Sequence, residues 1–205
     1  MIRKPLNLPL QVQVEEALLR RLSPRHKKRP EITARLQKGW AGYVGEQQLA
    51  YHLNFLSEQE YDLFFDLRLV ANKKMCQLDA LIVSPHALFV VESKNFLGEL
   101  LYDQHTRRFI RKYQNQETSF PDPIMQLNRQ RAVLTDWLRT QRISIPIAGL
   151  VLIGNSTSML KTNEGSNDIY RQMLFAEQIP DQIPDQIRHI TQAQYKQKVL
   201  TPYKL

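Results

Sequence analysis

Two apolar segments of strand length, residues 75–84 and 87–93, lie on either side of a tight turn at Pro85. If they form an antiparallel hairpin centred just after that proline, residues whose numbers sum to 171 face one another. Asp79 then lies opposite Glu92, with the two Cβ atoms ~5 Å apart on one face. The sequence therefore predicts two neighbouring carboxylates between strands that are otherwise apolar.

Lys94 follows Glu92 by two residues, so its side chain is expected on the same face of the hairpin. Two buried carboxylates repel each other unless a cation lies between them. Oxygen ligands favour Mg²⁺ or Mn²⁺ over zinc, and such an ion can activate water and neutralise phosphate charge. A lysine alongside can stabilise developing negative charge. The alternative is a cross-strand salt bridge between Lys94 and Asp79 or Glu92.

A helix is expected at residues 42–56, before the first strand. Glu46 falls in its apolar stripe, because Leu49 and Leu53 follow at positions i+3 and i+7. This spacing predicts a third carboxylate on the buried face of the helix. The alternative is an edge position from which the side chain of Glu46 reaches water.

The remaining pattern indicates an α/β fold with a mixed central β-sheet flanked by helices and an N-terminal helical, basic appendage. Asp122 is expected to cap a helix that ends near residue 139, with a proline in its first turn. The Gln-Ile-Pro-Asp repeat at 178–185 is expected to form a turn before a C-terminal helix. The other expected elements are helices at 10–22 and 31–38, strands at 61–70, 99–103, 107–113, 148–153 and 172–176.

Positive charge is concentrated near the N-terminus. The net charge is +8, and residues 1–40 carry 10 Lys and Arg against 3 Asp and Glu. A basic, proline-bounded linker is expected at 23–30. Such an arm attracts polyanions, including nucleic acid, although it can also serve only as a solubilising surface.

Composition and the lengths of the apolar runs exclude several classes of protein. The single cysteine, Cys76, excludes an internal disulfide and a multi-cysteine zinc site. No apolar run approaches the ~20 residues that a transmembrane helix needs. The N-terminal residues lead into no apolar secretory stretch, so a cytoplasmic protein without membrane contact is expected.

Three motifs occur in order: Gly42-x-x-Gly45-Glu46, then Gln77-Leu-Asp79-Ala-Leu-Ile-Val, then Val90-Val-Glu92-Ser-Lys94-Asn95. This set resembles the nuclease-related domain (NERD) family of the PD-(D/E)XK nuclease superfamily. The resemblance covers residues 42–138 and implies a restriction-endonuclease-like core within 41–205, with 1–40 as a basic helical arm and linker. One departure is Leu78, which stands where the superfamily name has proline.

The resemblance also implies roles for individual residues. Asp79 and Glu92 would bind the metal with the backbone carbonyl of Ser93. Lys94 would be the catalytic lysine. Glu46 would match the acidic residue of the first helix, and Gln126 the polar residue that many superfamily members place beside the site.

These observations predict a Mg²⁺- or Mn²⁺-dependent nuclease that acts on DNA in preference to RNA. One alternative is a nucleic-acid-binding or regulatory module that keeps the fold with little or no catalysis. Another is an interaction scaffold in which the helix around residues 14–22 docks a partner or forms a homo-oligomer.

Overall fold

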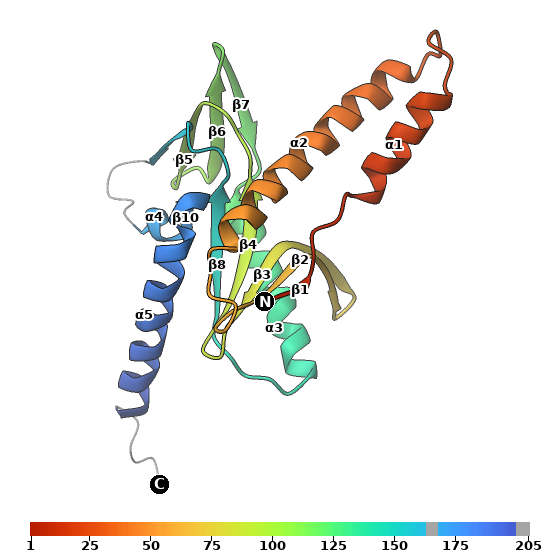
Figure 1. Ribbon diagram of the computed structural model, residues 1–205. Helices are drawn as coiled ribbons and strands as arrows, with labels where there is room; N and C mark the ends of the chain where they lie inside the picture. The colour runs from red at the N-terminus through yellow and green to blue at the C-terminus, as the bar shows by residue number, and fades with distance from the viewer. Residues whose placement is uncertain (163–167, 200–205) are drawn as a thin grey trace.

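The computed structural model describes residues 1–162 and 168–199, which form two β-sheets and their flanking helices (Figure 1). The larger sheet has six strands in the order β1-β2-β3-β4-β8-β10. Its strands are β1 (Ile2–Lys4), β2 (Asp62–Ala71), β3 (Lys74–Val83), β4 (Leu88–Lys94), β8 (Ile147–Ile153) and β10 (Met173–Phe175).

The larger sheet is mixed, as predicted. The pairs β2–β3 and β3–β4 are antiparallel, whereas β1–β2, β4–β8 and β8–β10 are parallel. The apolar strands β4 and β8 are interior strands of this sheet, and their buried residues face both ways. A continuous apolar run is what a strand covered on both faces requires.

A second, four-stranded sheet was not predicted. Its order is β7-β6-β5-β9, from β7 (Gln116–Phe120), β6 (Arg108–Tyr113), β5 (Glu99–Asp103) and β9 (Met159–Thr162). The hairpin of β5 and β6 was expected, but β7 and β9 were missed. Four of the five residues of β7 are exposed, so no apolar alternation marks it as a strand.

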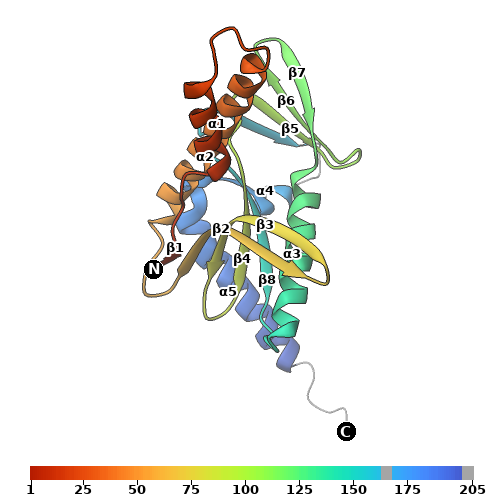
Figure 2. The ribbon, with the colours of Figure 1, turned by 90° about the vertical axis from the view of Figure 1, so that its right-hand side faces the viewer.

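Helices cover both faces of the larger sheet (Figures 1 and 2). Leu49 and Leu53 of α2 pack in one apolar cluster with Ile179 and Ile183 of α5. Leu127 of α3 packs in a second cluster on the opposite face. The helical elements are α1 (Leu10–Arg21), α2 (Arg29–Leu53), α3 (Pro123–Thr140), α4 (Ile169–Gln172), the 3₁₀ turn η1 (Ala176–Gln178) and α5 (Ile179–Val199).

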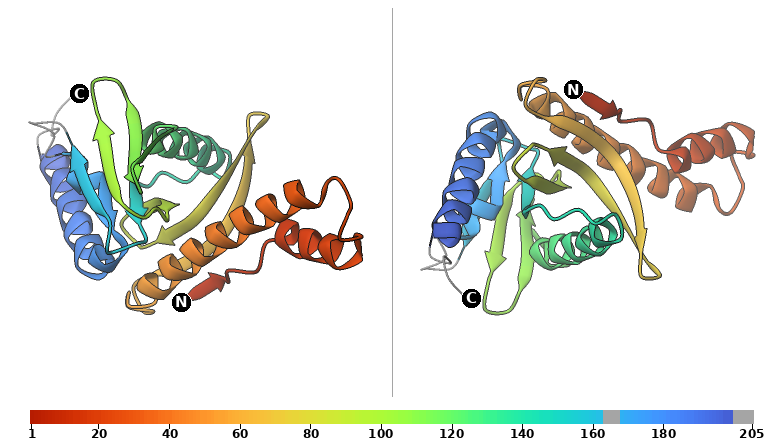
Figure 3. Two further views of the ribbon diagram at one scale, coloured as in Figure 1. Left: turned by 90° about the horizontal axis from the view of Figure 1, so that it is seen from above. Right: turned by 90° about the horizontal axis from the view of Figure 1, so that it is seen from below.

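One helix, α2, replaces the two that were expected at 31–38 and 42–56. Its glycines weaken helix propensity, but Gly39 lets the buried Val12 of α1 pack directly against the helix. This antiparallel pairing of α1 and α2 extends away from the sheets (Figure 3). Packing therefore outweighs local propensity, and no break separates residues 40 and 41.

Two further expectations are corrected by the fold. The Gln-Ile-Pro-Asp repeat is not a turn, because Pro184 lies inside α5, where the burial of Ile179 and Ile183 offsets its missing N–H. The first residues of the chain also belong to the larger sheet. Nζ of Lys4 donates to the carbonyl oxygen of Phe65 at 2.6 Å, which ties β1 to β2.

Among the described residues, no helix combines the length and the apolar character required to cross a bilayer.

Candidate active site

The β3–β4 hairpin has the predicted register. Its pairs run from Val83↔Leu88 to Ala80↔Val91, and each pair sums to 171. Ser84 closes the turn, because its backbone N–H donates to the carbonyl oxygen of Ala87 at 3.1 Å. The register places Asp79 and Glu92 next in line after the last backbone pair.

Asp79 lies at the point where the backbone ladder ends. Its Oδ2 accepts a hydrogen bond of 2.8 Å from the backbone N–H of Ser93, on the neighbouring strand. Within residues 1–162 and 168–199, no donor contacts its other oxygen, Oδ1. The carboxylate therefore stays fixed against β4 while one oxygen remains available to a ligand.

Glu92 is buried, with 3% of its surface exposed, and a different side chain holds each of its oxygens. Nζ of Lys94 lies 2.6 Å from Oε1, and Nε2 of Gln130 lies 2.7 Å from Oε2. Lys94 also donates to Oε1 of Gln126 at 3.2 Å. The structure therefore brings Asp79, Glu92, Ser93, Lys94 and Gln126 together, and it also contains the salt bridge that was the alternative reading of Lys94.

Gln130 is a site residue that the sequence analysis missed. It is buried on α3, one turn after Gln126, and it also donates to the carbonyl oxygen of Gln77 at 2.9 Å. The signal was present, because glutamines four residues apart share one face of a helix. A buried amide on that face requires polar partners, and here one partner is Glu92.

Glu46 is half-buried on α2 and faces the other acids. Burial raises its pKa, and the negative charges of Asp66 and Glu92 raise it further. Its neighbour Gly45 packs so closely on Asn95 that an added Cβ would lie 2.5 Å from the Cβ of Asn95. This contact fixes α2 against the segment that follows Lys94.

Asp66 is a second acidic residue that the sequence analysis did not single out. It lies in β2 between the pairs Phe65↔Ala80 and Leu67↔Leu78, which places it beside Asp79 in the sheet. Its φ of 46° lies in the left-handed region, and its Oδ1 accepts a 2.7 Å hydrogen bond from Gln77. An aspartate inside an apolar strand was the available signal.

The negative charge of the carboxylates in the site exceeds the positive charge that the chain places beside them. The pKa of Asp79 is raised to about 7, first by burial and then by the charge of Glu92. The Ser93 N–H and the charge of Lys94 oppose that rise, whereas Glu46 adds to it. A further positive charge at this position would restore the ionised carboxylate.

The family model described as NERD, the nuclease-related domain, matches residues 41–154, which is more than half of the chain. The chain belongs to the NERD family. The match begins in α2 and ends just after β8, so it includes every residue brought together above. No curated protein and no solved structure gives a significant match.

The donor atoms of this NERD site fit Mg²⁺ or Mn²⁺ in charge and chemistry. Among the described residues, no group of three or more His, Cys, Asp or Glu side chains is placed to hold a metal ion. Magnesium does not require such a group, because it usually keeps several waters and binds through one or two carboxylates. Asp79, Glu92 and the Ser93 carbonyl would supply the oxygen ligands.

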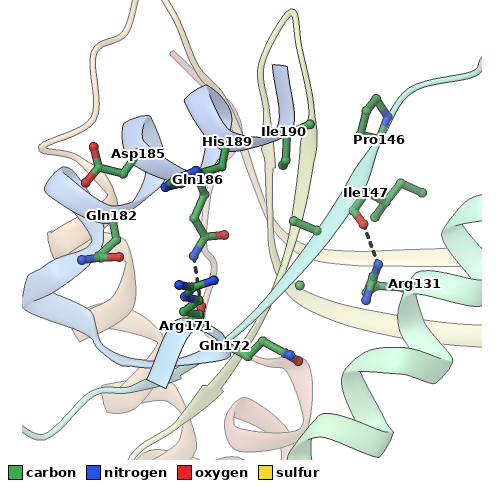
Figure 4. Close-up of a pocket in the computed structure, with 12 residues that line it drawn as sticks. Arg131, Pro146, Ile147, Arg171, Gln172, Gln182, Asp185, Gln186, His189 and Ile190 are labelled. Carbon is green, nitrogen blue, oxygen red and sulfur yellow. Dashed lines mark hydrogen bonds between the residues drawn. The ribbon is translucent and has the colours of Figure 1, made fainter. Parts of the chain in front are cut away.

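Two hollows of the NERD chain differ in their relation to this site. A pocket of about 480 Å³ lies between α5 and β8, lined by Arg131, Arg171 and His189 among others, and Asp66, Asp79, Glu46 and Glu92 do not line it (Figure 4). A second, of about 550 Å³, lies between β3 and α3. Its lining includes Gln126 and Gln130, so it opens beside the acids.

Proposed function

We propose that this chain is a metal-dependent nuclease that hydrolyses phosphodiester bonds, with DNA preferred over RNA. The observation that carries the proposal is the meeting of Asp79, Glu92 and Lys94 where β3 and β4 separate. Membership of the NERD family supports the same assignment. Two carboxylates that meet in an apolar sheet suit the binding of a cation. A lysine that contacts one of them and an amide oxygen suits the binding of a phosphate.

Each residue has a role that follows from its contacts. Asp79, Glu92 and the carbonyl of Ser93 would hold Mg²⁺ or Mn²⁺, which supplies an activated water and charge neutralisation when bound. Lys94 would leave Glu92 for the attacking water or the phosphate, because among the described residues its ammonium is held by Glu92 and Gln126 alone. Glu46 would orient the ion or bind a second one.

Gln126 and Gln130 position the charged groups. The amide of Gln130 fixes Oε2 of Glu92, and the amide oxygen of Gln126 guides the ammonium of Lys94. Preorganised groups of this kind stabilise a transition state without rearranging during the reaction. In the hydrolysis itself, water adds to phosphorus and the departing oxygen takes up a proton.

The basic arm would bind the substrate backbone. Residues 1–40 carry a net charge of +7, from 10 basic and 3 acidic side chains, and the turn between α1 and α2 holds several of them. Neutralising phosphates with lysine and arginine makes affinity strongly salt-dependent. The arm would therefore supply sequence-independent affinity for nucleic acid.

One observation favours the alternative of a binding module with little or no catalysis. The ammonium of Lys94 contacts Glu92 directly at 2.6 Å and so supplies part of the charge that a metal would supply. In that case the acids would be structural, and the arm would bind nucleic acid without cutting it.

Cleavage of plasmid and single-stranded DNA with Mg²⁺ or Mn²⁺ tests the proposal. We expect Asp79→Ala and Lys94→Ala each to lower the rate by on the order of 100-fold or more. Asp168→Ala and Lys112→Ala are matched controls, because both residues are exposed and lie outside the site. Full activity in both site variants would exclude this site.

Filter binding across a salt series separates the two functions. Steeply salt-dependent binding by the wild-type chain, with no metal-stimulated product, would favour the binding module. Product formation that requires the metal and is lost in Asp79→Ala would favour the nuclease.

A further inference from the structure

A groove of about 530 Å³ separates α2 from the β6–β7 hairpin, and we call it the α2–β6 groove. Val44 and Gln48 of α2 form one wall, and Arg111 and Tyr113 of β6 form the other. Amide side chains, including Asn95, line much of the remainder, and no acidic residue does. Among the residues that the structure describes, Arg111 therefore supplies the one charged side chain that lines this groove.

Arg111 is held by aromatic rings instead of by an acid. The guanidinium carbon lies 5.7 Å from the ring centres of Phe96 and Phe120 and 5.9 Å from that of Tyr113. Its Nε is buried without a hydrogen-bond partner. Within the described part of the chain, the guanidinium also forms no ion pair. A half-buried, preorganised cation without a counter-charge favours an anionic ligand.

The same groove adjoins the proposed active site. Asn95, which lines it, directly follows Lys94 and packs against Gly45. Phe96, whose ring Arg111 contacts, is the next residue, so one short segment carries both the catalytic lysine and a ring that holds the cation of β6. An anion bound by Arg111 would therefore lie near the acids of β3 and β4.

The opposite wall offers surfaces on which bases can stack. Tyr51 is 61% exposed on the face of α2 that carries Val44. A neighbouring hollow of about 360 Å³ shares Val44 and Gln48 with the α2–β6 groove and includes Tyr51. The two hollows therefore adjoin along α2, and Tyr51 lines one and Tyr113 the other.

We propose that the α2–β6 groove binds a single strand of nucleic acid, with Arg111 on a backbone phosphate and Tyr51 and Tyr113 against bases. This inference rests on the proposed nuclease function and names its substrate as single-stranded. Aromatic platforms combined with a cationic wall suit unpaired bases, whose faces are open for stacking. In a duplex those faces are occupied by neighbouring base pairs.

Fluorescence anisotropy with a labelled oligothymidylate, in EDTA, measures this binding without cleavage. We expect Arg111→Gln to weaken affinity roughly five-fold or more and to reduce the salt slope by about 0.7. Arg108→Gln is the matched control, because Arg108 is exposed on the same strand and points to the opposite face. Arg111→Lys keeps the charge and should keep the salt slope.

A second pair of variants probes the other wall. Val44→Glu places a negative charge in the groove at a position that is 42% exposed. Val70→Glu makes the same change at a position that is 63% exposed on β2, away from the groove. We expect only Val44→Glu to weaken binding of the oligothymidylate, and both variants should melt like the wild type.

Competition identifies the ligand. An unlabelled single strand should displace the probe at far lower concentration than a hairpin duplex, thymidine monophosphate or inorganic phosphate. Equal affinity of Arg111→Gln and Arg108→Gln would overturn the proposal, and so would equal competition by duplex or by the mononucleotide.

These experiments distinguish a failure of the proposed nuclease function from a failure of the groove assignment. If Asp79→Ala retains cleavage while Arg111→Gln loses affinity, the active-site assignment falls and the groove assignment stands. If the wild type cleaves through Asp79 but Arg111→Gln binds and cleaves normally, only the groove assignment falls.

Discussion

Nε2 of Gln130 lies 2.7 Å from Oε2 of Glu92, so α3 holds one oxygen of a carboxylate whose other oxygen contacts Lys94. A buried carboxylate is costly unless both oxygens are paired. The helix that begins at the Asp122 cap therefore helps to fix the charge at the centre of the sheet.

Replacing Gln130 by leucine should lower both the stability of the protein and its cleavage activity. The variant removes a hydrogen bond to a charged group, so we expect a loss of about 1.5–3 kcal/mol in the free energy of unfolding. Metal-dependent cleavage should fall by roughly 10- to 100-fold, because the ligand carboxylate loses its orientation. Urea unfolding and plasmid cleavage measure both effects. Gln192→Leu, at an exposed position on α5, is the control, and equal behaviour of the two variants would contradict the role of Gln130.

Asp79 predicts a pH dependence of stability in the metal-free protein. Its pKa is about 7 in the folded chain against an ordinary 3.8, so the folded state holds this proton more tightly than the unfolded state. The contribution of Asp79 to stability therefore falls as the pH rises from about 4 to about 7 and is constant above that.

Asp79→Asn should remove this dependence. The amide oxygen can still accept from Ser93, so we expect the Tm at pH 8 to exceed that of the wild type by about 3 °C or more. At pH 4 the two proteins should melt together, because Asp79 is then protonated. Asp168→Asn, an exposed position, should follow the wild type at both values. If Asp79→Asn had a higher Tm than the wild type at pH 4 but not at pH 8, the assigned direction of the pKa shift would be wrong.

Gly45→Ala and Gly42→Ala form a matched pair within α2. A Cβ at Gly45 would meet the Cβ of Asn95 at 2.5 Å, whereas a Cβ at Gly42 would meet nothing within 4 Å. Alanine is favoured over glycine in a helix by about 1 kcal/mol, so Gly42→Ala should stabilise the chain. Gly45→Ala should instead destabilise it by about 1–3 kcal/mol and reduce cleavage, because α2 and Glu46 must move away from β4. Thermal unfolding of both variants measures these effects. Stabilisation by Gly45→Ala would show that the contact between Gly45 and Asn95 is not tight.

The expectation of a homo-oligomer can be tested on α1. Leu10, Val14 and Leu18 are 73%, 43% and 41% exposed and recur every fourth residue, which places them along one side of the helix. If copies of the chain associate through this stripe, Val14→Glu with Leu18→Glu should lower the sedimentation coefficient to that of a monomer. Deleting residues 1–40 is a poorer test, because it removes β1 from the larger sheet and divides α2. Identical sedimentation of the wild type and the double variant would contradict association through α1.

The sequence was sufficient for those parts of the site that depend on local order. The register of Asp79 and Glu92 follows from one short turn, and the face of Lys94 follows from strand alternation. The Asp122 cap also follows from neighbouring residues, since its side chain accepts from the N–H groups of Ile124 and Met125. Each of these relations involves residues that are close in the chain, so periodicity and turn chemistry are enough to define them.

The missed features depend on segments that are distant in the chain. β9 pairs with β5 across about 60 residues, and β1 pairs with β2 across a similar interval. Asp66 joins the site only because β2 lies beside β3, and Gln130 only because α3 crosses that face. Local pattern does not specify such neighbours, since each results from tertiary packing.

The unbroken course of α2 has a geometric consequence for the way a substrate would be held. The helix rises 1.5 Å per residue, so its basic end at Arg29 stands about 25 Å from Glu46. A straight helix keeps that distance constant. A nucleic-acid substrate bound at the tip of the arm would therefore be cut at a fixed distance from the bound phosphates, and the lengths of the products would reflect the length of α2.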